Sequence, residues 1–174
     1  MSGLLVGAVF GAVFVFVNAR SPLDDVVVTV LRVLAGLAVA AVLALWFAGV
    51  RRPAAAVSGG AAGTMFGRGY LIVVAVEVLA LFGGLRLLAA LGASAEVNVA
   101  WVAIIVGVHF VALAPVWKDW TIAVPGVALT LLGIAGFLMA WAGSLPWVPI
   151  VSGVASGAVL LAGSLTAGLR LARP

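Results

Sequence analysis

Long apolar runs alternate with short polar breaks along the whole chain. Six of the runs are about as long as the roughly 20 apolar residues that a helix needs to cross a bilayer; they cover 2–19, 26–50, 70–92, 97–117, 121–142 and 147–170. The breaks carry prolines, glycines and charged residues, as in Arg20-Ser21-Pro22. The pattern predicts an all-α fold, a polytopic membrane helix bundle with six transmembrane helices, which forms a single transmembrane domain over 1–174.

The composition places this bundle in lipid. Hydrophobic residues make up 66% of the chain and charged residues only 8%, whereas soluble proteins are about 25% charged. The net charge is +4, but the basic residues are spread along the chain and form no patch for nucleic acid. Cysteine is absent and there is one histidine, so we expect no disulfide, no metal site and no cofactor. The lipid bilayer is the expected partner.

Basic residues in the breaks predict the direction of the spans. Membrane proteins carry an excess of Lys and Arg in their short cytoplasmic loops. One side of the bundle holds Arg51, Arg52, Arg68, Lys118, Arg170 and Arg173, whereas Arg20 lies in a break on the other side. We therefore expect both termini and the long loop 51–69 to be cytoplasmic. We also expect residues 2–19 to be a retained span and not a cleaved signal peptide, because no basic region precedes them.

The excess of Arg over Lys and the high content of Ala, Val, Leu and Gly indicate a GC-rich bacterial genome, and so a bacterial inner membrane. Short sequence matches also occur in the same order in the two halves 1–92 and 97–174. Gly11-Ala12-Val13-Phe14-Val15 matches Gly107-Val108-His109-Phe110-Val111, and GLRLLA (84–89) matches GLRLAR (168–173). Two three-helix halves would have opposite orientations, as in many transporters. Chance matches in so repetitive a composition are the alternative.

Glu77 and His109 are the most informative polar residues inside the spans. Glu77 lies seven residues after Tyr70, about 10 Å deep, and His109 lies eight residues before Trp117, about 12 Å deep. A short loop joins their two spans, so the two side chains should be level in an antiparallel hairpin. We expect them to face each other or a shared cavity. They form either a proton or ligand site or a polar contact that only holds two helices together.

Other polar and small residues gather at the outer ends and along helix faces. An outer polar cluster comprises Asp24, Asp25, Arg32, Arg86 and Asn98, for which structural pairing is favoured over a substrate-binding rim. Glycines at helical spacing allow helices to approach closely; these are Gly3, Gly7 and Gly11 in the first span and Gly153 and Gly157 in the sixth. They join these two spans within one chain or build a homo-oligomer.

These features favour a proton-linked carrier or channel for a small solute, with Glu77 and His109 as its proton site. The alternatives are a membrane-embedded enzyme that modifies lipids with the same pair, and a structural membrane subunit of a larger complex. Catalytic chemistry is the less favoured class. The sequence offers a nucleophile with a base only as Ser152 or Ser156 with the single histidine, His109. No catalytic residue is assigned.

Overall fold

The computed structural model describes residues 2–51 and 67–172. Most of the loop 51–69, together with Arg52 and Arg173, lies outside the described residues. In the described part the chain is helical, which confirms the expected all-α fold. The helices are α1 (Ser2–Asn18), α2 (Asp25–Val50), α4 (Arg68–Ala90), α5 (Ala95–Trp117), α6 (Ala123–Trp141) and α7 (Ala155–Ala172), with the short 3₁₀ helices η1 (Trp120–Ile122) and η2 (Leu145–Trp147) and the π-helix η3 (Pro149–Val154).

The helices have the length and apolarity of membrane spans. Five helical segments among the described residues are long and apolar enough to cross a bilayer. The sixth, α1, is also apolar, and its 17 residues lie at the lower limit of about 17 residues for a spanning helix. The chain is therefore a multi-pass membrane protein.

The ends of the helices follow from local chemistry. The Asp24 carboxylate accepts a hydrogen bond from the Val26 backbone N–H and so caps the start of α2. Gly92 and Gly143 have φ angles of 69° and 80°, the left-handed conformation that ends α4 and α6 at little steric cost. Lys118 ends α5 with a φ of 54°, and the turn continues into Asp119, whose carboxylate accepts from the Thr121 N–H.

The first compact unit comprises residues 1–56 and 153–174 and contains α1, α2 and α7. Helices α1 and α7 approach closely through glycines: a Cβ atom on Gly11 would lie 2.9 Å from the Gly157 carbonyl oxygen. Gly7 lies against Ser164 and Gly153 against Asn18, whereas no atom lies within 4 Å of the Cβ position of Gly3. Helix α2 contacts both α1 and α7. Four of the five glycines expected to mediate helix packing thus lie where α1 contacts η3 and α7.

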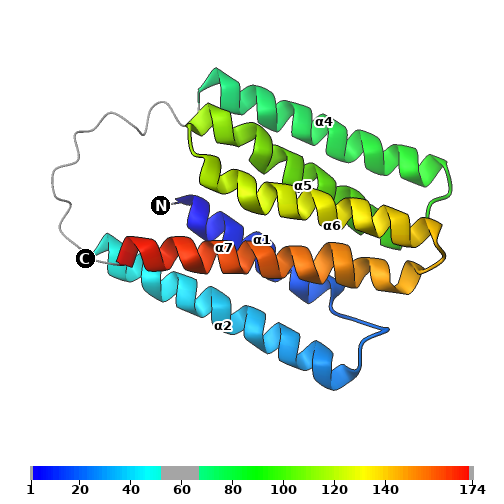
Figure 1. Ribbon diagram of the computed structural model, residues 1–174, viewed down its shortest axis with the longest axis horizontal. Coiled ribbons are helices and arrows are strands. Elements are labelled where there is room, and N and C mark those ends of the chain that lie inside the picture. The colour runs from blue at the N-terminus through cyan, green and yellow to red at the C-terminus, as the bar shows by residue number, and fades with distance from the viewer. Residues whose placement is uncertain (1, 52–66, 173–174) are drawn as a thin grey trace. The chain divides into compact units, whose positions relative to one another are not determined.

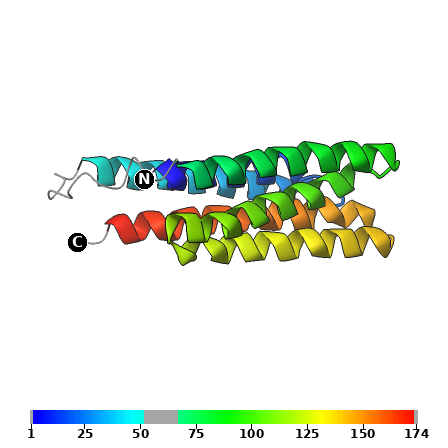
Figure 2. The same ribbon diagram turned by 90° about the horizontal axis from the view of Figure 1, so that it is seen from above.

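The second compact unit covers residues 57–152 and contains α4, α5 and α6. Helix α5 lies between the other two (Figures 1 and 2). Its contact with α6 again depends on glycines. A Cβ atom on Gly107 would lie 2.6 Å from the Gly126 carbonyl oxygen, and a Cβ atom on Gly133 would lie 2.7 Å from the Ala100 carbonyl oxygen. Helix α4 packs on the other side of α5, and none of its side chains is fully buried.

The two units do not coincide with the halves 1–92 and 97–174 that the sequence matches suggest, because α7 groups with α1 and α2 and α4 groups with α5 and α6. An inverted repeat in the sequence stays a prediction. What the structure adds is a local resemblance, since each unit contains one pair of helices in glycine-mediated contact.

Candidate functional site

The α4–α5 hairpin carries the candidate site, and an aromatic contact fixes its register near the turn. The Trp101 indole lies so close to Gly84 that a Cβ atom there would overlap the ring. The same indole N–H donates a hydrogen bond of 3.3 Å to the Leu81 carbonyl oxygen. Trp101 on α5 is therefore held against one position of α4.

A second aromatic contact closes the other end of the hairpin. Tyr70 at the start of α4 stacks on Trp117 at the end of α5, with ring centroids 6.1 Å apart and an interplanar angle of 15°. The half-buried residues of α4 recur every three or four positions, from Tyr70 through Val73, Glu77 and Ala80 to Gly84. Glu77 belongs to this stripe, which is the face of α4 that packs on α5.

Glu77 and His109 meet between these two aromatic contacts. The His109 Nδ1 atom lies 2.8 Å from Glu77 Oε2, and the two side chains are 16% and 22% exposed. The Nδ1 atom forms no hydrogen bond of regular geometry among the described residues. Polar contacts at functional sites are often poorly aligned before a ligand binds.

The short distance requires a proton between the two groups. If imidazole and carboxylate both presented lone pairs at 2.8 Å, they would repel each other, so one of the two atoms carries a hydrogen. Three arrangements place a hydrogen there: a carboxylate with an imidazolium, a carboxylic acid with an imidazole, and a carboxylate with a neutral imidazole that has its hydrogen on Nδ1. The first two are neutral overall, and the third has one negative charge. A neutral pair is the form that costs least within a membrane span.

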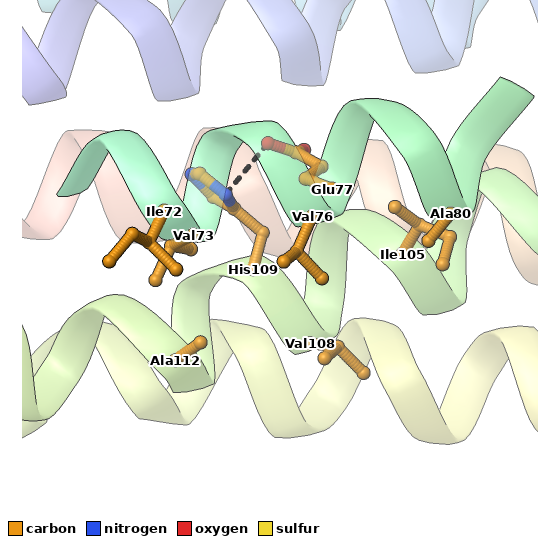
Figure 3. Close-up of a pocket in the computed structure, with 9 residues that line it drawn as sticks. All are labelled: Ile72, Val73, Val76, Glu77, Ala80, Ile105, Val108, His109 and Ala112. Carbon is orange, nitrogen blue, oxygen red and sulfur yellow. Dashed lines mark ion pairs between the residues drawn. The ribbon is translucent and has the colours of Figure 1, made fainter. Parts of the chain in front are cut away.

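A half-open pocket of about 190 Å³ adjoins the pair (Figure 3). Glu77 and His109 supply its only polar side chains, and the remaining walls are apolar: Ile72, Val73, Val76 and Ala80 from α4, and Ile105, Val108 and Ala112 from α5. In Figure 3 the imidazole of His109 extends from α5 toward the Glu77 carboxylate, and the apolar side chains lie on both sides of this contact.

The pocket opens on the flank of the hairpin at the depth of the spans. Its lining residues begin four residues inside α4 and stop five residues before the end of α5. Three of them, Ile72, Val76 and Val108, are 63%, 60% and 48% exposed. The opening is therefore bordered by exposed apolar side chains, the kind that membrane spans present to lipid.

The predicted outer polar residues have separate roles in the structure. Arg32 donates from Nη2 to the carbonyl oxygens of Ala19 and Phe16, at 3.0 and 3.3 Å, and thereby satisfies orphan carbonyls at the end of α1. Asp24 caps α2, and the Asp25 carbonyl oxygen accepts from the Thr29 hydroxyl. No ion pair links Arg32 to an aspartate in the described part of the chain.

Arg86 and Asn98 belong to the second unit, on α4 and α5. Arg86 is exposed and Asn98 half-buried. Whether any of the five outer residues binds a ligand stays a prediction.

No group of three or more His, Asp or Glu side chains capable of holding a metal occurs in residues 2–51 and 67–172. Ser152 donates to the Leu132 carbonyl oxygen, and the buried Ser156 hydroxyl has no hydrogen-bond partner among the described residues.

The sequence reasoning missed the apolar walls of the pocket and the contact between Trp101 and Gly84. No signal marked the walls, because small and branched apolar residues such as Ala, Val and Leu occur along every span. For Trp101 a signal was present: a bulky indole on one helix of a hairpin and two glycines, Gly83 and Gly84, near the level of Trp101 on the other.

Comparison with known proteins gives no relative from which a function could be inferred. No family model matches the chain, and no characterised protein and no solved structure is significantly similar to it. The functional argument therefore rests on the chemistry of the Glu77–His109 pocket.

Proposed function

We propose that the protein is a proton-linked carrier for a small solute, with Glu77 and His109 as its proton-binding site. One observation carries the proposal: two titratable side chains lie 2.8 Å apart, next to a half-open pocket within a membrane-spanning hairpin. Ionisable residues in spans are costly, and they commonly mark proton relays and substrate pathways.

The depth of the pair supports a carrier over a purely structural contact. Glu77 lies nine residues after the start of α4 and His109 eight residues before the end of α5, about 12–14 Å from those helix ends. A contact that served only to join the helices would need no pocket beside it. Here a solute that enters the pocket meets both polar groups, so its binding and that of the proton are coupled through one site.

The proposal includes a location and a direction. The protein resides in the inner membrane of a bacterium, and both termini face the cytoplasm. This orientation follows from the basic residues Arg51, Arg68, Lys118 and Arg170, which lie at span ends that six alternating spans would assign to one side of the membrane. The pair then lies in the cytoplasmic half of the hydrocarbon layer.

Reconstitution into liposomes tests the carrier. Purified protein is placed in vesicles that contain a pH-sensitive dye, a pH gradient is imposed, and solutes are added class by class: sugars, amino acids, carboxylic acids and organic cations. The expected result is that one class accelerates loss of the gradient, and that Glu77→Gln abolishes the acceleration. Glu96→Gln, a change of the same kind near the start of α5, should leave it intact. If no class moves protons in a Glu77-dependent manner, the proposal is wrong.

The opening on the flank of the hairpin also favours a second candidate, an enzyme that modifies a membrane lipid with Glu77 and His109 as acid and base. Mass spectrometry of total lipids from vesicles of bacterial lipid extract, before and after incubation with the protein, tests this candidate. An enzyme would convert one lipid species in a manner that requires Glu77. An unchanged lipid profile would exclude catalysis on the lipids of that extract.

A further inference from the structure

The walls of the Glu77–His109 pocket restrict what can bind there. Seven of its nine lining residues are Ala, Val or Ile, which offer no hydrogen bond from a side chain. A sugar or an amino acid would leave several polar groups without partners in this pocket, and each unpaired group costs free energy. The pocket, of about 190 Å³, is also smaller than the roughly 300–1,000 Å³ of sites for drug-sized ligands. The geometry fits a compact ligand with an apolar body.

The charge of the site determines the charge that the polar end of the ligand must have. Glu77 is the only carboxylate among the lining residues of the pocket, and in the neutral forms of the pair one dissociable proton on His109 or Glu77 balances its negative charge. An anion would be repelled by the carboxylate. A monovalent cation instead can balance Glu77 in place of that proton, so that the site stays neutral in both states.

We propose that the ligand of this site is a small amphiphilic organic monocation, which enters sideways from the bilayer between α4 and α5 and displaces the proton shared by Glu77 and His109. This inference rests on the proposed function and names its substrate class. One cation binds as one proton leaves His109 or Glu77 for water, so the net charge of the site does not change. The carrier is then an exchanger of protons for organic cations.

No other titratable group interferes with this exchange. Helix α6, which packs on α5, carries no titratable residue. On α4 the nearest other titratable residues are Tyr70, seven residues from Glu77, and Arg68 and Arg86, each nine residues from it. At the end of α5, Lys118 lies nine residues from His109. The distances along the helices, about 10 Å or more, leave Glu77 and His109 as the groups that release the proton.

Proton release in weakly buffered solution tests the proposal directly. Phenyltrimethylammonium is added to the full-length protein in phosphatidylcholine nanodiscs, and the solution pH is followed with an indicator. This probe has a permanent charge, so any proton released comes from the protein. The expected result is close to one proton per bound cation. Its neutral counterpart of the same shape, tert-butylbenzene, should release none. Tetramethylammonium, which lacks the apolar body, should bind at least about tenfold more weakly.

Paired variants separate the role of the site from effects on folding. Glu77→Gln should abolish proton release, whereas Glu96→Gln should not change it. Ala112→Leu reduces the volume of the pocket and leaves both polar groups in place, so it should weaken cation binding about tenfold or more. Ala75→Leu, the same change on an exposed position of α4 outside the pocket, should have no effect. Circular dichroism of each variant verifies that the helices are intact.

A lipid with an amine headgroup is a second source of the same chemistry. Repeating the titration in nanodiscs rich in phosphatidylethanolamine distinguishes the sources. A lipid ligand would compete with phenyltrimethylammonium and reduce the proton release that it causes, whereas a free cation as ligand predicts equal release in both lipids.

Binding of tert-butylbenzene with the same affinity as the cation, or proton release that persists in Glu77→Gln, would overturn the inference. If another solute class drives Glu77-dependent proton flux while the cation does not, the carrier stands and this inference fails. If no class does, both fail.

Discussion

Replacement of Gly107 by alanine tests how tightly α5 is held against α6 behind the candidate site. A Cβ atom at Gly107 would lie 2.4 Å from the Thr130 hydroxyl oxygen, 2.5 Å from the Thr130 backbone nitrogen and 2.6 Å from the Gly126 carbonyl oxygen. The hydroxyl can rotate away, but the other two atoms belong to the backbone of α6. An ordinary contact needs at least 3.4 Å, so the two helices have to separate by nearly 1 Å.

The cost follows from this separation. A gap of 0.5–1 Å forfeits about a quarter to a half of the dispersion energy of each affected contact, and overpacking of this kind costs about 1–3 kcal/mol. Alanine also gains up to about 1 kcal/mol over glycine in a helix, which masks part of the effect. Gly83→Ala on α4 corrects for that gain, because no atom lies within 4 Å of its Cβ position. We expect Gly107→Ala to be less stable than Gly83→Ala by about 1–3 kcal/mol.

Equilibrium unfolding in mixed micelles with increasing sodium dodecyl sulfate, followed by circular dichroism, gives the two free energies of unfolding. The difference between the variants is the relevant quantity, since helix propensity contributes to both. Equal stability of Gly107→Ala and Gly83→Ala would refute the close contact between α5 and α6, and with it the fixed position of His109 on α5.

Three further measurements address individual contacts. A double-mutant cycle with Glu77→Gln and His109→Gln should give a coupling energy of about 0.5–2 kcal/mol in the same unfolding assay, and a value of zero would mean that the two side chains do not interact. Arg32→Gln removes two hydrogen bonds to the end of α1 and should lower the free energy of unfolding by about 1 kcal/mol; an unchanged value would show that water replaces the guanidinium. Asp24→Ala removes the cap of α2 and should cost about 1 kcal/mol, whereas Asp25→Ala, which removes no capping bond, should cost less.

The sequence determined the helices well because their signal is local. The runs 2–19 and 97–117 correspond to α1 (Ser2–Asn18) and α5 (Ala95–Trp117), and the breaks that separate them contain residues that end or cap helices. The main local difference lies before α7, where the run 147–170 begins with a 3₁₀ helix and a π-helix. Nothing in an apolar run distinguishes a π-helix from an α-helix, because a change in the buried face leaves no mark where the residues on every side are apolar.

Which helices pack together could be predicted from the sequence only for the hairpin of α4 and α5 and, as one of two alternatives, for α1 and α7. In a soluble helix one apolar face indicates the side that packs, but α2 and α4 are apolar on all sides, so the lipid face and the protein face look alike. The partner of Arg32 was hidden for a related reason. It is a pair of backbone carbonyl oxygens at the end of α1, and backbone atoms leave no mark in the sequence. Glu77 and His109 could be matched only because a short loop and a count of residues put them at one depth.

The glycine-mediated contacts of α1 with α7 and of α5 with α6 can be compared position by position, which shows what His109 contributes to helix packing. A Cβ atom on Gly157 of α7 would touch the Gly11 carbonyl, Phe14 and Val15 of α1. A Cβ atom on Gly126 of α6 would touch the same three kinds of group on α5, the Gly107 carbonyl, Phe110 and Val111. The matching segments Gly11–Val15 and Gly107–Val111 therefore use the same positions for packing.

One position between these contact positions, the second residue after each glycine, takes no part in the glycine-mediated helix contact. In α1 it is Val13, which is 53% exposed; in α5 it is His109, which extends to Glu77 of α4. Since the helix pair of α1 and α7 makes its contact with an apolar residue at this position, the histidine is not needed to bring α5 and α6 together. Its cost within the membrane has to be offset by what it does with Glu77 and the adjoining pocket, and that is the physical case for a proton site there.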